Sequence, residues 1–172
     1  KVDASGNSSL VGSFSGTGVD FAMGSSSSTN IDAAGASDAF IAKYNSSGEL
    51  QWVNTFGSAV THERLNGISI NSDGDLLVVG YLGNDTGGGG MDLDPGTNTV
   101  SVVGQKDALV AKYDADGNYL DHFVIGSENT GTQEFLDVAV NHGDSIYVVG
   151  YMGDPNATVA DMDPGTETKN IH

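Results

Sequence analysis

The sequence repeats itself with a period of about 69 residues, and this repeat limits the folds that the chain can adopt. Asp-Ala-Phe-Ile-Ala-Lys-Tyr at residues 38–44 returns as Asp-Ala-Leu-Val-Ala-Lys-Tyr at residues 107–113. Further segments match at the same spacing or at one residue more: 77–81 with 147–151, 92–97 with 161–166, and Gly57 with Gly126. Because the matches keep one register over most of the chain, each period is predicted to be one copy of the same structural unit.

Each period contains short apolar blocks separated by Gly, Asn, Asp and Ser, a pattern that predicts strands and turns. An Asp-Gly pair lies in the turn at residues 72–75 and another in the turn at 114–118, as is typical of hairpins. A Gly-rich connection of about 24 residues, which carries Asp-Leu-Asp-Pro-Gly, separates the second strand from the third. The four strands predicted for the complete copy are Leu65–Asn71, Leu76–Leu82, Asp107–Tyr113 and Tyr119–Gly126.

Four antiparallel strands per repeated unit favour an all-β fold made of β-propeller-like blades. A β-solenoid would use shorter coils, and a pair of β-sandwiches would not repeat its sequence in register. The chain then holds roughly two and a half repeats. The predicted divisions are a partial blade at 1–57 (the end of an innermost strand, then strands two to four), a complete blade at 58–126, and a partial blade at 127–172 (two strands and the loop).

The segments at residues 38–52 and 65–80 resemble the SBBP repeat, a β-propeller repeat of secreted and cell-surface proteins of bacteria and archaea. The resemblance covers nearly the whole chain and implies that the strand from Leu65 is innermost and the strand from Tyr119 is outermost. The chain departs from the family in its long connection between strands two and three. The family is defined by its architecture, so the resemblance implies no catalytic residues.

The composition excludes several functional classes. The 23 Asp and Glu residues against 6 Lys and Arg give a net charge of −17, which argues against nucleic acid as a partner. The absence of Cys removes disulfides and cysteine-ligated metals. No apolar run approaches the roughly 18 residues of a membrane-spanning helix, so no transmembrane segment is predicted.

Paired carboxylates in the long connection are the candidate metal ligands: Asp92 with Asp94, and Asp161 with Asp163. Carboxylate and turn carbonyl oxygens suit Ca²⁺, and no other cofactor is predicted. The alternative is that each Asp caps a turn through backbone N–H groups. The first copy reads Asp-Phe-Ala from Asp20 and lacks the second carboxylate, so it would be the weak or empty site. The acidic segment at 114–118 lacks the full EF-hand pattern and is expected to be a plain hairpin turn.

Two further features bear on location and assembly. Four Asn-x-Ser/Thr sequons, which are candidate glycosylation sites, occur at Asn7, Asn45, Asn84 and Asn156. A propeller ring needs at least about four blades. The missing strands would therefore come from further blades of the same chain, or from neighbouring subunits through open strand edges, which is a form of self-association.

No catalytic or cofactor-binding residue can be assigned, because the four His residues lack metal-ligand spacing and no Gly-x-Ser-x-Gly elbow is present. We therefore predict a non-catalytic extracellular or cell-surface protein with a structural or adhesive role. It would be part of a larger propeller, a filament or a surface layer. One alternative is a Ca²⁺-dependent module that binds a glycan or protein ligand. A second alternative is a fragment of a propeller hydrolase or lyase.

Overall fold

The computed structural model describes residues 1–22, 27–59, 62–83, 90–94, 99–101, 106–126, 131–153, 160–161 and 170–171, with the backbone alone at 90–91, 99–101, 160–161 and 170–171. These residues form strands and turns and no helix, which confirms the all-β prediction. No helix long and apolar enough to cross a membrane occurs within these ranges. The strands are β1 (Ser8–Phe14), β2 (Val19–Asp20), β3 (Asn30–Ile31), β4 (Asp38–Tyr44), β5 (Leu50–Phe56), β6 (Arg64–Ile70), β7 (Leu76–Gly83), β8 (Gly90–Asp92), β9 (Thr99–Ser101), β10 (Lys106–Tyr113), β11 (Tyr119–Ile125), β12 (Thr132–Val140), β13 (Ile146–Gly153), β14 (Ala160–Asp161) and β15 (Asn170–Ile171).

The central sheet has four antiparallel strands in the order β6-β7-β10-β11, and we call it unit 2. Tight turns join β6 to β7 and β10 to β11, as the two Asp-Gly pairs predicted. Each of the four strands begins and ends within about one residue of its predicted position. Alternation of apolar residues with turn residues was therefore sufficient to place this sheet in the sequence.

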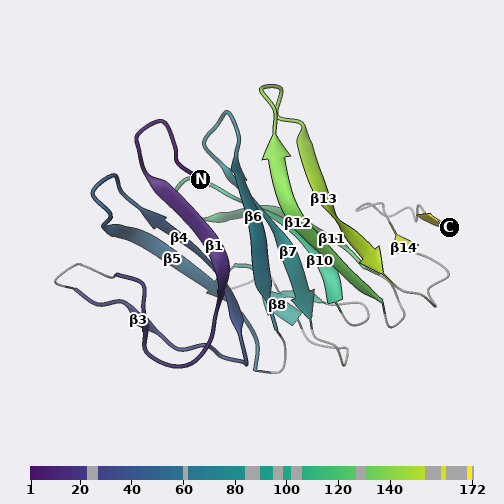
Figure 1. The fold of residues 1–172 in the computed structure, drawn as a ribbon, viewed down its shortest axis with the longest axis horizontal. Helices are drawn as coiled ribbons and strands as arrows, with labels where there is room; N and C mark the ends of the chain where they lie inside the picture. The colour runs from purple at the N-terminus through teal and green to yellow at the C-terminus, as the bar shows by residue number, and fades with distance from the viewer. Residues whose placement is uncertain are drawn as a thin grey trace.

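Similar sheets flank unit 2 on both sides (Figure 1). Strands β1, β4 and β5 form an antiparallel sheet, unit 1, which corresponds to strands two to four of unit 2. Strands β12 and β13 form an antiparallel pair, unit 3, which corresponds to the first two strands. A single parallel bridge, Lys106 with Thr132, joins unit 3 to unit 2, and its repeat equivalent, Ser37 with His62, joins unit 2 to unit 1. The described sheets do not close into a ring.

The hydrophobic core lies between the units, because the central sheet is apolar on both faces. Alternate residues of β7 enter different clusters: Val78 faces unit 1, whereas Val79 faces unit 3. The cluster between units 1 and 2 includes Ile41, Phe56, Leu65, Val78, Leu109 and Tyr113, and the cluster between units 2 and 3 includes Leu77, Val79, Val110, Ile125, Phe135 and Val138. Each unit is therefore stabilised by its neighbours.

Candidate functional site

The predicted acidic loop of unit 2 is anchored in the core by its middle residue. Leu93 is 1% exposed and packs in the cluster between units 1 and 2. The buried hydroxyl of Tyr113 donates a hydrogen bond to the Leu93 carbonyl at 3.0 Å. Asp92 Oδ1 accepts the backbone N–H of Asp94 at 3.1 Å, which closes a short turn. Asp92 therefore acts as a turn cap in this loop.

The first copy of this loop has the same geometry without the second carboxylate. Asp20 Oδ1 accepts the N–H groups of Ala22 and Thr29, both at 2.9 Å. Tyr44, the repeat equivalent of Tyr113, donates its hydroxyl to the Phe21 carbonyl at 2.8 Å. Asp20 and Asp92 thus make the same kind of capping hydrogen bond, although only the second copy has the additional carboxylate of Asp94.

The remaining predicted metal ligands are only partly placed by the structure. Asp161 pairs through its backbone with Asn170, but its side chain lies outside the described residues, as does the whole of Asp163. Across the part of the chain that the structure describes, no three Asp, Glu or His side chains come together in a metal-binding group.

The short hairpin turns share one hydrogen-bond pattern in all three units. In the turn from Asp114, the carboxylate accepts the N–H groups of Asp116 and Asn118, and the fourth residue, Gly117, has a φ of 87°. This confirms the expectation of a hairpin turn. Asn118 donates its side-chain amide to the same carboxylate and is the main cause of the lowered pKa of Asp114. Turns that begin at Asp3, Asn45, Asn71 and Asn141 repeat the pattern.

Two of the four sequons lie in these turns. Asn7 donates its side-chain amide to Asp3 at 2.8 Å, and Asn45 donates its side-chain amide to Glu49 at 2.7 Å. Both residues are half-buried. Asn84 and Asn156 lie outside the described residues. Glycosylation of any of these sites stays a prediction.

A group of two buried acidic residues, Asp38 and Glu63, joins unit 1 to unit 2 beside Gly57, and it was not predicted from the sequence. The Asp38 carboxylate accepts the N–H groups of Ala34 at 2.7 Å and Gly35 at 3.2 Å. A Cβ at Gly57 would overlap this carboxylate. Glu63 is also buried, and desolvation followed by the charge of Asp38 raises its pKa from 4.5 to about 8. Glu63 is therefore largely protonated at neutral pH.

The same group recurs between units 2 and 3 with one substitution. Asp107 and Gly126 take the positions of Asp38 and Gly57, and a Cβ at Gly126 would overlap the Asp107 carboxylate. Gln133, which is buried, takes the position of Glu63. A neutral Gln thus replaces a carboxyl group that burial keeps neutral. The 69-residue spacing of Gly57 and Gly126 was the sequence signal that could have revealed both groups.

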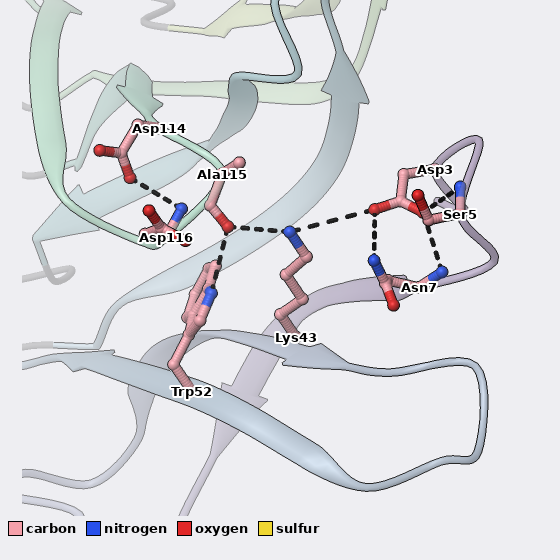
Figure 2. A network of polar contacts seen from close by, with 8 residues as sticks. All are labelled: Asp3, Ser5, Asn7, Lys43, Trp52, Asp114, Ala115 and Asp116. Carbon is pink, nitrogen blue, oxygen red and sulfur yellow. Dashed lines mark hydrogen bonds and ion pairs between the residues drawn. The ribbon is translucent and has the colours of Figure 1, made fainter.

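A second polar network links unit 1 to unit 2 at the side of their junction (Figure 2). The Ala115 carbonyl of unit 2 accepts hydrogen bonds from Lys43 Nζ at 2.8 Å and Trp52 Nε1 at 3.3 Å. Lys43 Nζ also lies 4.0 Å from Asp3 Oδ2, which is in the first turn of unit 1. The indole of Trp52 packs against Gly117, where an added Cβ would lie 3.0 Å from the ring. These residues fix the position of one unit on the next.

One face of unit 3 is exposed, whereas the equivalent face of unit 2 is buried. Tyr147 is 59% exposed and Val149 is 61% exposed. Their repeat equivalents in β7, Leu77 and Val79, are covered by unit 3 itself. An apolar hollow lies between β11 and unit 3 as well. These surfaces are the strongest candidate interaction sites in the described residues.

The comparisons with known proteins agree with a repeat architecture. The chain matches no protein-family model. It is similar to an uncharacterized WD repeat-containing protein of Acanthamoeba polyphaga mimivirus, with 31% identity over 126 residues. The match covers 72% of this chain and 9% of that relative, so the chain spans a small part of the relative's length. WD repeats form propeller blades, so this similarity suggests a β-propeller-type repeat in general.

Proposed function

We propose that this chain is a non-catalytic structural and interaction segment whose units stack side by side in a larger β-propeller-type assembly. The observation that carries the proposal is the burial of β7 against unit 3, while the equivalent face of β13 is exposed. A contiguous apolar face of this kind marks an interaction site. In the proposed assembly, another unit covers it.

The polar chemistry of the chain supports a structural role. Asp92 and Asp114 cap turns, Asp38 and Glu63 hold a junction, and Lys43 links two units. A histidine outside the junctions, His122, contacts the Tyr119 hydroxyl through Nδ1. These contacts favour a scaffold over an enzyme.

We further propose that the assembly is extracellular or on the cell surface, as a filament, a surface layer or part of an adhesion protein. The support is the resemblance to the SBBP repeat, the acidic composition, and the position of the Asn7 and Asn45 sequons in hairpin turns. An intact mass above that of the unmodified chain, lost after treatment with a glycosidase, would support glycosylation. A mass equal to the unmodified value would contradict it.

Electron microscopy of the protein as its natural source produces it tests the assembly proposal. We expect particles in which further units continue from unit 3, as a closed ring, a filament or a lattice. Isolated three-unit particles with the outer face of β13 in solvent would contradict the proposal. So would a reconstruction in which an unrelated fold covers this face.

The calcium-dependent binding module stays the alternative, and it rests on the Asp92 and Asp94 pair and its repeat. The capping geometry that Asp20 shares with Asp92 favours a structural role. We therefore predict that the melting temperature changes by less than about 1 °C between EDTA and excess Ca²⁺, because an ion bound to the folded state would stabilise it. A rise with Ca²⁺ that the variant Asp94→Asn abolishes would instead establish the metal site.

A further inference from the structure

One edge of β13 is unpaired within the described residues, and the equivalent edge is paired in both other units. In unit 1, β1 pairs with β4 from Ser8–Tyr44 to Phe14–Asp38. In unit 2, β7 pairs with β10 from Gly83–Lys106 to Leu76–Tyr113. Among the described strands, β13 pairs with β12 alone. Both occupied edges hold a strand of the sequence Asp-Ala-apolar-apolar-Ala-Lys-Tyr.

An apolar hollow of about 460 Å³ lies beside this edge. One wall consists of Phe123 and Ile125 of β11. The other wall includes Phe135 of β12 and Val148 and Met152 of β13. Its lining is therefore almost wholly hydrophobic, which suits apolar side chains in place of a polar ligand.

The equivalent space between units 1 and 2 is filled. There, Phe56 takes the place of Ile125. Leu65, Val78 and Leu82 take the places of Phe135, Val148 and Met152. The four residues between units 1 and 2 belong to one cluster, together with three alternate side chains of β10: Leu109, Ala111 and Tyr113. In unit 2 the third strand, β10, thus pairs with the second strand, β7, and its alternate side chains fill the space between units 1 and 2.

From this equivalence we propose that the β13 edge and the hollow are a docking site for a third-strand segment of a further repeat unit. The side chains at the third, fifth and seventh positions of its Asp-Ala-apolar-apolar-Ala-Lys-Tyr sequence would enter the hollow. They correspond to Leu109, Ala111 and Tyr113, which fill the space between units 1 and 2. The backbone would bond to β13, which is strand addition to an open edge. This proposal rests on the proposed function and names the partner of that surface.

The donor is a further repeat because both third strands of this chain are occupied. Strand β4 pairs with β1 and β5, and β10 pairs with β7 and β11. The motif occurs in the sequence at residues 38–44 and 107–113 and nowhere else. A second copy of the chain could donate such a strand only by opening one of its own sheets.

A peptide of residues 106–113, labelled with fluorescein, tests the site on the 172-residue chain by fluorescence anisotropy. Two variants of the peptide have the same length and the same charge as each other. Leu109→Asp alters a side chain that enters the hollow, and Val110→Asp alters a side chain on the opposite face of the strand. Because the substitutions are in the peptide, the fold of the chain is unchanged. Hydrogen exchange of the chain locates the bound peptide.

We expect saturable binding of the parent peptide and of Val110→Asp, at least about tenfold weaker binding of Leu109→Asp, and slower exchange along β13. No saturable binding, equal binding of the two variants, or slowed exchange elsewhere would overturn the proposal. Dimerisation of the chain without peptide, with β13 protected, would overturn the choice of donor. Electron microscopy of the natural assembly can still succeed if the peptide fails, so the two proposals are tested separately.

Discussion

Glu63 has the most perturbed environment of the acidic residues for which a shift is resolved. The residue is 1% exposed, and desolvation together with the charge of Asp38 raises its pKa to about 8, against an opposing hydrogen bond from the Ser58 backbone. Because the unfolded chain ionises Glu63 near pH 4.5 and the folded chain near pH 8, the folded state binds more protons between these values. Stability therefore falls as the pH rises through this window.

We predict that the free energy of unfolding drops by a few kcal/mol between pH 5 and about pH 8, because the unfolded chain releases the Glu63 proton in this window while the folded chain retains it. Urea unfolding at a series of pH values measures the drop. The variant Glu63→Gln, which copies Gln133 of the next junction, should flatten the curve. The matched variant Gln133→Glu should steepen it. If the free energy of unfolding fell equally with pH in the wild type and in Glu63→Gln, the Glu63 carboxyl group would not be the cause of the pH dependence.

Gly57 is a second residue on which the junction depends, for a purely steric reason. Its Cβ would overlap the Asp38 carboxyl group, so Gly57→Ala should cost about 1–3 kcal/mol of stability. Gly143→Ala is the matched control, since its Cβ would lie 3.5 Å from Asn141 Oδ1, at ordinary contact distance. Chemical denaturation of both variants checks the prediction. Equal losses would mean that the close approach at Gly57 is not required.

At the scale of the element, the hairpin turns depend on an Asp or Asn in their first position. Asp114→Ala removes the acceptor of two backbone N–H groups and should cost about 1 kcal/mol. Asp114→Asn should be nearly neutral, because Asn45, Asn71 and Asn141 perform the same role. Thermal unfolding distinguishes the two variants. A larger loss with Asn than with Ala would indicate a role for the charge that the hydrogen bonds do not explain.

The strands and turns could be predicted from the sequence because both depend on local patterns. Alternating apolar residues placed β6, β7, β10 and β11, and the Asp-Gly pairs placed their turns. The buried pair of Asp38 and Glu63 could not be predicted in this way, since it forms between units and Glu is ordinarily exposed. The acidic loop was ambiguous for a related reason: only the burial of Leu93 shows that the loop turns into the core.

At the scale of the whole molecule, each unit depends on its neighbours for the burial of its faces. The same alternate positions that face unit 3 in β7 are solvent-exposed in β13. An isolated four-stranded sheet of this composition would leave two apolar faces in water, which is unfavourable. The repeat and the packing together therefore lead to the central claim that another unit covers unit 3.

The reactivity of single thiols tests this claim most directly, because the chain contains no Cys. The variants are Val149→Cys, on a residue that is 61% exposed, and Val79→Cys, on its buried repeat equivalent. In the 172-residue chain, we expect fast labelling of the first and slow labelling of the second. In the polypeptide as its natural source produces it, both should be labelled slowly. Fast labelling of Val149→Cys in that natural polypeptide would contradict the account.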